Sequence, residues 1–422
     1  MVKQLGTWRG WWVAVLIAAA TLAAACGSSA PAGPGASSPG TGAGLHGTPV
    51  KVLTFAPVNS QVISFPEALT MAKVAGDWIN AHGGINGHPL QVITCDTQDI
   101  QAQTAACARE AVSDKVVAVV GGFDIYGNQY IPILQAAGIP IIGQLASGAI
   151  DVARTSTVSF PITPLFAVNT TAASALAVAR GCKAIANIDF QGDPTATLSY
   201  AKLGAGSVPV KSIVFPATTT DFASVIAEVP ANACIIEQTP SNSDTEALLR
   251  QYETSGGSEA VYSPSIGSWP PALATDAPKI YQGSITGSNF SPPTANSAWA
   301  PMLKAAALYN KQDGPPMSLG AEDAQDDWAS YIIVWNALKG MQNPTAAALW
   351  QKLKTDTNVN SSGLLPALDF AKTQPNPNIA RVFNPYYFYW AVTAPGQYKP
   401  YCGSYHSLLP ALLGKPVSVS CS

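Results

Sequence analysis

The stretch INAHGGINGHPLQV, Ile79 to Val92, holds two of the chain's four histidines. His82 and His88 flank a group of glycines, which raises the question of a metal or catalytic site. Glycine, however, readily adopts the positive φ angles that end helices and form tight turns. We therefore interpret the stretch as a helix C-cap and a turn that enters a strand at its amino end, and we expect no metal site. The glycines concerned are Gly83, Gly84 and Gly87.

The segments around this turn predict an alternation of strands and helices. Val50–Val58 is a continuous apolar strand, and Pro66–Ala81 has apolar residues at helical spacing. The same unit recurs with short loops, which is typical of a parallel sheet covered by helices on both faces. Further strands are expected at His88–Asp96, Val116–Gly122 and Ile139–Gly143, and helices at Thr104–Ser113 and Asn128–Gly138.

A second alternation begins near Pro164 and predicts a second sheet with its own core. Its strands are expected at Lys183–Phe190, Val210–Pro216, Ala233–Gln238 and Glu259–Pro264, and its helices at Ala167–Arg180, Pro194–Gly204, Phe222–Glu228 and Thr245–Ser255. Thr286–Pro293 has the composition of a loop. Three helices then follow, at Ala298–Tyr309, Asp323–Met341 and Ala346–Thr355. Arg381–Tyr401 predicts a β-hairpin that turns at Pro395–Gly396.

Charge is sparse and nearly balanced. The chain has 22 basic and 25 acidic residues, a net charge of −3, and no Lys/Arg-rich run. Nucleic-acid binding depends on clustered basic residues. The composition therefore argues against a nucleic-acid partner.

The first 48 residues are not expected to belong to the fold. Residues 1–25 have a basic start and an apolar run, which is typical of a signal peptide. LAAAC, Leu22 to Cys26, resembles a bacterial lipobox and implies a diacylglycerol anchor on Cys26. The alternative is an ordinary signal peptide, cleaved after an Ala-x-Ala. Residues 26–48 are rich in Gly, Ser and Pro and predict a flexible tether.

Six further cysteines remain, an even number that indicates disulfides in an exported chain. Proximity in the sequence favours Cys95–Cys107, Cys182–Cys234 and Cys402–Cys421, although other connectivities are possible. Free buried thiols are the alternative. No C-x-x-C motif is present, so neither zinc nor redox chemistry is indicated.

The order of elements resembles the type 1 periplasmic binding proteins, and within them the branched-chain amino-acid (Leu/Ile/Val) receptors of ABC importers. The likeness rests on Asp77–Asp96, Ala105–Gly122 and Ile133–Gly143, where the first helix ends at a Gly-Gly-Ile-x-Gly turn. It implies an α/β fold of two lobes, each a mainly parallel sheet flanked by helices, joined by a three-crossing hinge. It also implies a monomeric receptor without a cofactor, lipid-anchored on the outer face of the bacterial cytoplasmic membrane, that works with ABC permease subunits.

The resemblance also implies lobe boundaries. Lobe 1 is expected to comprise residues 49–161 and 289–372, and lobe 2 residues 162–288 and 373–422. The crossings then fall near Phe160–Thr163, Ser284–Asn289 and Gln374–Arg381. A small molecule, an amino acid or a related amide or carboxylate, would be enclosed between the lobes by hinge closure.

In this family, residues of the loops after the third and fourth strands of lobe 1 bind the ligand. Those loops carry Phe123, Asp124, Tyr126, Gln144 and Ser147 here. Ser147 is expected to supply a hydroxyl, or else to cap a helix. Asp124 either pairs with a cation or caps the next helix. Phe123 and Tyr126 either form a wall of the site or pack on their own lobe.

The corresponding strand ends of lobe 2 carry Phe190, Gln191, Glu237 and Ser265. Amino-acid-binding members pair the ligand ammonium with lobe 2 carboxylates. At about those positions this chain has Leu165, Phe166 and Ser265, none of which is acidic. Since a buried ammonium without a carboxylate is costly, either another acid replaces them or the ligand is not a free α-amino acid. The candidate replacements are Asp124, Asp193 and Glu237.

Two other functional classes stay open. A lipoprotein of this fold could sense a ligand and signal without transport. A secreted hydrolase is less favoured, because the chain has no G-x-S-x-G or H-E-x-x-H motif, and nothing positions His82 or His88 for catalysis. We therefore expect a receptor and not an enzyme.

Overall fold

The computed structural model describes residues 44–60, 63–146, 156–164, 166–190, 194–239, 241–265, 269–282, 284–313, 322–372, 384–395 and 397–421. Cys26, Ser147, Gln191 and Asp193 lie outside these residues. Among the described residues, none of the helices combines the length and apolar character that a bilayer crossing needs.

The first sheet, sheet 1, is parallel throughout, as the apolar strands predict. Its order is β2-β1-β3-β5-β7. The strands are β1 (Val50–Ala56), β2 (Leu90–Asp96), β3 (Ala118–Val120), β5 (Ile141–Ile142) and β7 (Ser159–Phe160). A separate parallel pair, β4 (Phe123–Asp124) and β6 (Leu145–Ala146), extends the chain beyond β3 and β5.

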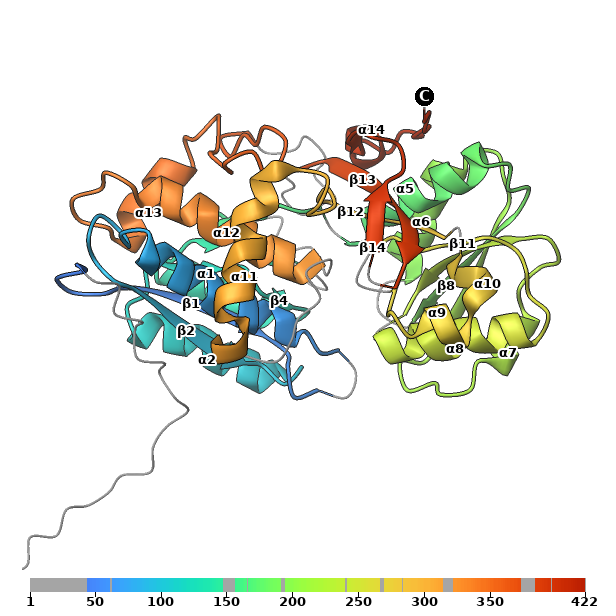
Figure 1. The fold of residues 1–422 in the computed structure, drawn as a ribbon, viewed down its shortest axis with the longest axis horizontal. Coiled ribbons are helices and arrows are strands. Elements are labelled where there is room, and N and C mark those ends of the chain that lie inside the picture. Colours follow the sequence, from blue (N-terminus) through green and yellow to red (C-terminus); the bar gives the residue numbers. More distant parts are fainter. Residues whose placement is uncertain are drawn as a thin grey trace, which may run out of the picture. The chain divides into compact units, whose positions relative to one another are not determined.

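Helices cover both faces of sheet 1 (Figure 1). One core contains Val50 and Val52 of β1 together with helices α1 (Pro66–Ala81), α11 (Ala300–Asp313), α12 (Glu322–Leu338) and α13 (Ala346–Leu353). The opposite face buries Leu53 and Phe55 against α2 (Gln101–Ser113) and α3 (Gly127–Ala136). Because side chains alternate along a strand, β1 contributes to both cores.

The second sheet, sheet 2, is mixed. Its order is β14-β13-β12-β11-β10-β8-β9, with β15 also paired to β13. The strands from β9 to β12 are parallel, and the C-terminal hairpin adds antiparallel strands, as predicted. The bounds are β8 (Ile185–Phe190), β9 (Val210–Phe215), β10 (Cys234–Gln238), β11 (Val261–Tyr262), β12 (Ile285–Ser288), β13 (Tyr386–Ala394), β14 (Gln397–Pro400) and β15 (His406–Ser407).

The prediction of a loop over Thr286–Pro293 is wrong in its first residues, where β12 lies. The strand contains Thr286, Gly287 and Ser288, so its sequence has little β-strand character. Its position between β11 and β13 buries it nevertheless. Gly287 is required there, because a Cβ would overlap the ring of Tyr387.

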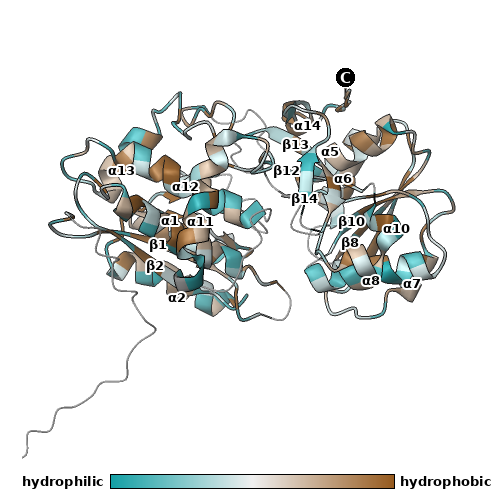
Figure 2. Cartoon of the chain, viewed as in Figure 1, coloured by the Kyte–Doolittle hydropathy of each residue, from teal (hydrophilic) through white to brown (hydrophobic). Residues whose placement is uncertain are grey.

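Helices also cover both faces of sheet 2. One face packs against α5 (Phe166–Ala179), α6 (Pro194–Ala205) and α14 (Leu409–Leu412). The other packs against α7 (Ala223–Ala227), α8 (Asn242–Thr254), α9 (Leu273–Asp276) and α10 (Pro278–Tyr281). Helix α8 illustrates the pattern: it carries both brown and teal residues in Figure 2, and it buries Leu248, Leu249 and Tyr252.

The three predicted disulfides are confirmed. Cys95–Cys107 joins β2 to α2, with Cα atoms 5.8 Å apart. Cys182–Cys234 ties the segment after α5 to the start of β10 at 5.9 Å, and Cys402–Cys421 links the C-terminal segment at 4.8 Å. Cys95–Cys107 thus joins a strand of sheet 1 to the helical layer that covers it, and Cys182–Cys234 does the same in sheet 2.

The glycine-rich stretch forms the predicted cap and turn at the amino end of β2. The backbone N–H of Gly84 donates to Ile79 O at 2.9 Å, which ends α1. His82 bonds to the carbonyl of Trp78 in the last turn of α1, and His88 bonds to the carbonyl of Thr48, before β1. The two histidines are thus used in backbone contacts. In the part of the chain that the structure describes, no group of three His, Cys, Asp or Glu could hold a metal ion.

The same turn is attached to the far end of α12. Asn86 donates through Nδ2 to Leu338 O and Met341 O, both at 2.9 Å, and accepts from the N–H of Gly340. Trp335 Nε1 donates to Gly84 O at 3.0 Å. These bonds fix α12 relative to α1 and β2, and with it the opposite end of α12.

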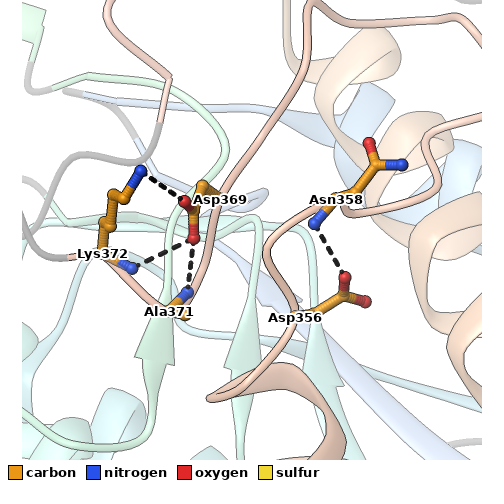
Figure 3. A network of polar contacts seen from close by, with 5 residues as sticks. All are labelled: Asp356, Asn358, Asp369, Ala371 and Lys372. Carbon is orange, nitrogen blue, oxygen red and sulfur yellow. Dashed lines mark hydrogen bonds and ion pairs between the residues drawn. The ribbon is translucent and has the colours of Figure 1, made fainter.

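A compact polar loop follows α13 (Figure 3). Asp369 accepts from the backbone N–H groups of Ala371 and Lys372, and the Lys372 ammonium lies 3.3 Å from its carboxylate. Asp356 accepts from the N–H of Asn358 at 3.1 Å. These bonds hold the turns at Asp356 and Asp369. The predicted crossing Gln374–Arg381 lies outside the described residues.

We expect Gly84→Ala to destabilise the fold by about 2–4 kcal/mol. The substituted residue would keep a φ of +61° and would overlap the carbonyl oxygen of His88. Gly138→Ala is the matched control, because Gly138 has a φ of +66° but open space around it, so only the backbone cost of about 1 kcal/mol applies. Urea denaturation at neutral pH measures both. Equal losses would show that the packing around Gly84 is unimportant.

Candidate functional site

The topological switch points of the two sheets indicate where a site is to be sought. In sheet 1 the chain order reverses between β1 and β3, and in sheet 2 between β8 and β10. In open parallel sheets, ligands bind outside the carboxyl ends of the strands at such points. The chain segments concerned follow Ala56, Val120, Phe190 and Gln238. We call these ends the carboxyl edges.

Helix α12 packs very closely against the carboxyl edge of sheet 1. A Cβ on Gly121 would overlap the carboxylate of Asp327, and one on Gly143 would overlap the hydroxyl of Ser330. Gly122 donates its backbone N–H to Asp327 Oδ1 at 2.9 Å. Glycine is therefore needed at these strand ends so that polar side chains of α12 can reach the backbone.

The first two turns of α12 carry four carboxylates that are not among the residues predicted from the sequence: Glu322, Asp323, Asp326 and Asp327. Acidic residues at a helix start are common, because they complement the helix dipole. The spacing i, i+1, i+4, i+5 nevertheless places them on one side of the helix. The apolar run that follows, Trp328–Trp335, was the available signal that this helix is buried.

Burial raises the pKa of all four carboxyl groups. For Asp323 the pKa rises to about 8, through burial first and then through Glu67 and Glu322 nearby. For Asp326 and Asp327 burial and the neighbouring carboxylates raise the pKa well above its usual range. Among the described residues, no Lys or Arg forms an ion pair with any of the four. The site is therefore rich in acceptors and poor in positive charge.

Glu322 connects α12 to two strand ends of sheet 2. It accepts from Ser265 Oγ at 2.9 Å, from Ser288 Oγ at 3.0 Å and from the N–H of Asn289 at 2.8 Å. Burial raises its pKa even though these three bonds favour the ionised form. The sequence indicates no acid beside Ser265, and the structure supplies one from a helix 57 positions away in the chain.

The predicted residues Asp124 and Tyr126 are held by hydrogen bonds within their loop and to neighbouring segments. Asp124 is buried and accepts from Tyr126 N at 2.7 Å and from Thr104 Oγ1 at 2.9 Å. The Tyr126 hydroxyl donates to Asp99 O. Asp124 therefore orders its own loop. The predicted cap of the next helix does not form, because the N-cap of α3 is Tyr126 and carries no side-chain cap bond.

The side chains of Phe123 and Gln144 are not held by such hydrogen bonds among the described residues. Phe123 is half-buried and packs edge-on against Phe65, with ring centroids 4.7 Å apart. Gln144 follows Gly143 and is buried, and neither atom of its amide has a hydrogen-bond partner among the described residues. A buried amide without partners is costly, which makes Gln144 a candidate for a binding role.

The carboxyl edge of sheet 2 has similar features. Glu237 is fully buried, and burial raises its pKa to about 8, against the opposing effect of hydrogen bonds from Ser263 and Thr239. One oxygen of Glu237 and both amide atoms of Gln238 lack partners among the described residues. The predicted residue Phe190 ends β8. It is partly buried and packs against the core between sheet 2 and helices α7 to α10.

The predicted residue Ser265 donates its hydroxyl to Glu322. The predicted residues Ser147 and Gln191 lie outside the described residues. The structure thus brings Phe123 and Gln144 to the carboxyl edge of sheet 1, and Phe190 and Glu237 to that of sheet 2.

Comparisons with known proteins agree with this fold. The sequence model of a family described as periplasmic binding protein matches residues 49–393. No curated protein sequence shows a significant match. Solved structures with similar folds include a leucine-binding protein from Thermotoga maritima, which is 15% identical, with a TM-score of 0.63 and coverage of 85% of this chain and 99% of the other.

Two further structures illustrate the range of ligands named for such folds. A branched-chain amino-acid binding protein from Streptococcus pneumoniae, in complex with isoleucine, is 16% identical, with a TM-score of 0.66 and coverage of 85% and 99%. A fatty acid ABC transporter substrate-binding protein from Thermomonospora curvata is 14% identical, with a TM-score of 0.67 and coverage of 85% and 92%. At such identities the likeness shows the two-lobed α/β fold and no particular ligand.

Glu237→Gln should change how stability depends on pH. In the folded state the Glu237 carboxyl keeps its proton up to about pH 8, whereas in the unfolded chain it loses it near 4.5. The folded state then binds more protons than the unfolded chain. The contribution of Glu237 to the free energy of unfolding therefore falls as pH rises through this window. The Gln variant should lack that fall, a difference on the order of a few kcal/mol between pH 5 and 8.

Urea denaturation at several pH values between 5 and 8 measures this difference. Glu228→Gln is the control, because its side chain is 60% exposed and should leave the pH profile unchanged. Parallel profiles for wild type and Glu237→Gln would contradict the raised pKa.

Proposed function

Because the chain belongs to the periplasmic binding protein family, we propose that it is an extracytoplasmic receptor that captures a small polar molecule and delivers it to an ABC importer. The family match spans both sheets and most of the chain. Its members bind small molecules and generally do not transform them. The importer partnership and the nature of the ligand are the specific parts of this proposal.

The observation that carries the proposal is the placement of unpartnered polar groups at both carboxyl edges. Gln144 follows β5 in sheet 1, and Gln238 ends β10 in sheet 2. Each is about 1% exposed, and each has an amide without a partner among the described residues. Groups of this kind cost stability, so a binding role gives a reason for their presence.

We further propose that residues 49–161 with 289–372, and residues 162–288 with 373–422, act as the two lobes that close on the ligand. The chain supports this division, because β7 is the last strand of sheet 1 before α5 of the sheet 2 layer. After β12 the chain returns to α11, which packs in the sheet 1 core. The receptor acts in this proposal as a monomer.

A lipid anchor on Cys26 would hold the receptor at the outer face of the cytoplasmic membrane. The expected tether of residues 26–48 is too long at its C-terminal end, because His46 donates its backbone N–H to Gly87 O and Thr48 O bonds to the His88 ring. The tether that we propose therefore ends before these residues, and it would let the binding domain reach a permease. A receptor that signals to a partner without transport is the second candidate. A permease gene beside this one would favour the importer.

A thermal-shift screen of a chain beginning at Gly44 tests receptor function. Candidates are amino acids, amides, small carboxylates, aromatic acids and amines. A ligand at about 100 times its dissociation constant should stabilise the fold by roughly 2.7 kcal/mol. Gln144→Met should weaken that shift, whereas Gln351→Met, on an exposed position of α13, should not. Turnover of a candidate without any shift in melting would favour an enzyme instead.

Cys26→Ser should abolish lipid attachment to the full-length protein expressed in a bacterial host. Cys26 is the single cysteine outside the three disulfides, so no other thiol can replace it. Incorporation of labelled palmitate measures the anchor, and Ser28→Ala, which keeps the cysteine, is the control. Equal labelling of Cys26→Ser and the control would show that the lipobox interpretation is wrong.

A further inference from the structure

The segment after β12 carries the chain from sheet 2 back to α11, and two side chains of α12 hold it. We call this segment, from Ser288 to Ser291, the β12 crossing. Glu322 Oε1 accepts from Ser288 Oγ at 3.0 Å and from the backbone N–H of Asn289 at 2.8 Å. Three positions further along the helix, Gln325 donates its Nε2 to Ser291 O at 2.9 Å. Residues at this spacing lie on the same face of a helix, so one face of α12 meets the crossing.

The β12 crossing is also bonded to the sheet 2 part of the chain. The side-chain amides of Asn289 and of Asn169 in α5 donate to each other, at 3.0 and 3.3 Å. Asn289 Nδ2 donates in addition to Tyr386 O of β13, and Phe290 O accepts from Trp390 Nε1, both at 2.9 Å. All four residues of the crossing are buried. A buried segment with this many bonds is a fixed junction, because local opening would break all of them together.

The second carboxylate oxygen of Glu322 reaches a neighbouring strand end. Its Oε2 accepts from Ser265 Oγ at 2.9 Å, just after β11. Because β11 and β12 are paired in sheet 2, one side chain holds two adjacent strand ends at the carboxyl edge. Glu322 and its three donor residues are all buried. An ionised carboxylate has acceptors only, so it matches a site that presents three donors.

The same part of α12 contacts the carboxyl edge of sheet 1. Asp327 Oδ1 accepts from the backbone N–H of Gly122 at 2.9 Å. The hydroxyl of Ser330 occupies the place that a Cβ on Gly143 would take. Packing this close leaves α12 no room to move toward sheet 1. The beginning of α12 therefore touches strand ends of both sheets, at the two edges where a ligand is expected.

We propose that Glu322 is a positioning residue, which sets the spacing between the two carboxyl edges by fixing the first turn of α12 to sheet 2. A ligand that contacts both edges has to match this spacing, and closure rotates the two sheets about the β12 crossing. This effect on binding rests on the receptor function proposed above, whereas the spacing itself does not. The role needs the length of the side chain more than its charge, because a side chain one methylene shorter cannot reach all three donors.

Three variants of Glu322 separate length from charge: Glu322→Ala, Glu322→Gln and Glu322→Asp. Spin labels are attached to p-acetylphenylalanine introduced at two exposed positions, Gln351 of α13 and Lys202 of α6, so that every cysteine is kept. Double electron–electron resonance on the ligand-free, full-length protein in detergent then measures the distance between the sheet 1 and sheet 2 parts. Glu322→Ala should make the distance distribution about twice as wide as in the wild type, because the two parts then sample more than one arrangement.

Glu322→Gln should keep the width of the wild type. Its amide oxygen can accept from the N–H of Asn289, and the Ser265 hydroxyl can turn to accept from its amide N–H. Glu322→Asp keeps the charge but is shorter, so it should widen the distribution. The reverse order, with Asp narrow and Gln wide, would overturn the positioning role and assign the effect to charge. Glu228→Ala, at an exposed acid paired with Lys211, is the control and should leave the width unchanged.

Thermal unfolding of the same samples distinguishes positioning from stability. A lower melting temperature with an unchanged distance distribution would show that Glu322 only stabilises the fold, which overturns the proposal. If Glu322→Ala does not fold, Ser265→Ala takes its place. It removes one of the three bonds and should widen the distribution to a smaller extent, and an unchanged width again overturns the proposal. Since no ligand is used, that result leaves the receptor function standing, and a failed ligand screen leaves the positioning role standing.

Discussion

The fit of α12 against sheet 1 is the constraint on which the rest of the structure depends. At one end of the helix, Trp335 donates to Gly84 O of the glycine turn before β2. Asn86 of the same turn donates to Leu338 O and accepts from Gly340 N–H. At the other end, Asp327 reaches the backbone of Gly122. This reach requires that Gly121 and Gly143 have no side chains. A buried helix that carries carboxylates is unfavourable by itself, so the fold tolerates it only because backbone N–H groups and hydroxyls meet those carboxylates.

Periodicity made most of the framework predictable. The bounds of α1 follow from its apolar spacing, its Pro66 start and its glycine end, all of which are local signals. The disulfides follow from sequence proximity, because each bridge joins two consecutive cysteines of the chain, 12, 52 and 19 positions apart. β12 was not predictable in this way, because its residues are polar or glycine and only neighbouring strands make it a strand.

For the candidate site, only the strand ends could be predicted from the sequence. Strand ends identify the carboxyl edges, and Phe123, Gln144, Phe190 and Glu237 lie there. Which side chains turn inward is a matter of tertiary contact: Asp124 bonds to Thr104 of α2, and Glu322 reaches Ser265 from a distant helix. No local pattern encodes such pairs, because each depends on two elements that the sequence separates widely. Nothing in the sequence therefore distinguishes the acids of α12 from ordinary helix-start charges.

The outer side of β2 is partly closed by a side chain of the helix that precedes it. β2 is the edge strand of sheet 1, and its inner side pairs with β1. The Asn80 amide occupies both backbone groups of Leu90, donating to its carbonyl at 2.9 Å and accepting from its N–H at 2.7 Å. An exposed strand edge is where a second chain can add a strand and begin aggregation. The helix that precedes β2 thus places a side chain where a foreign backbone would otherwise dock, and shields the start of the sheet's open side.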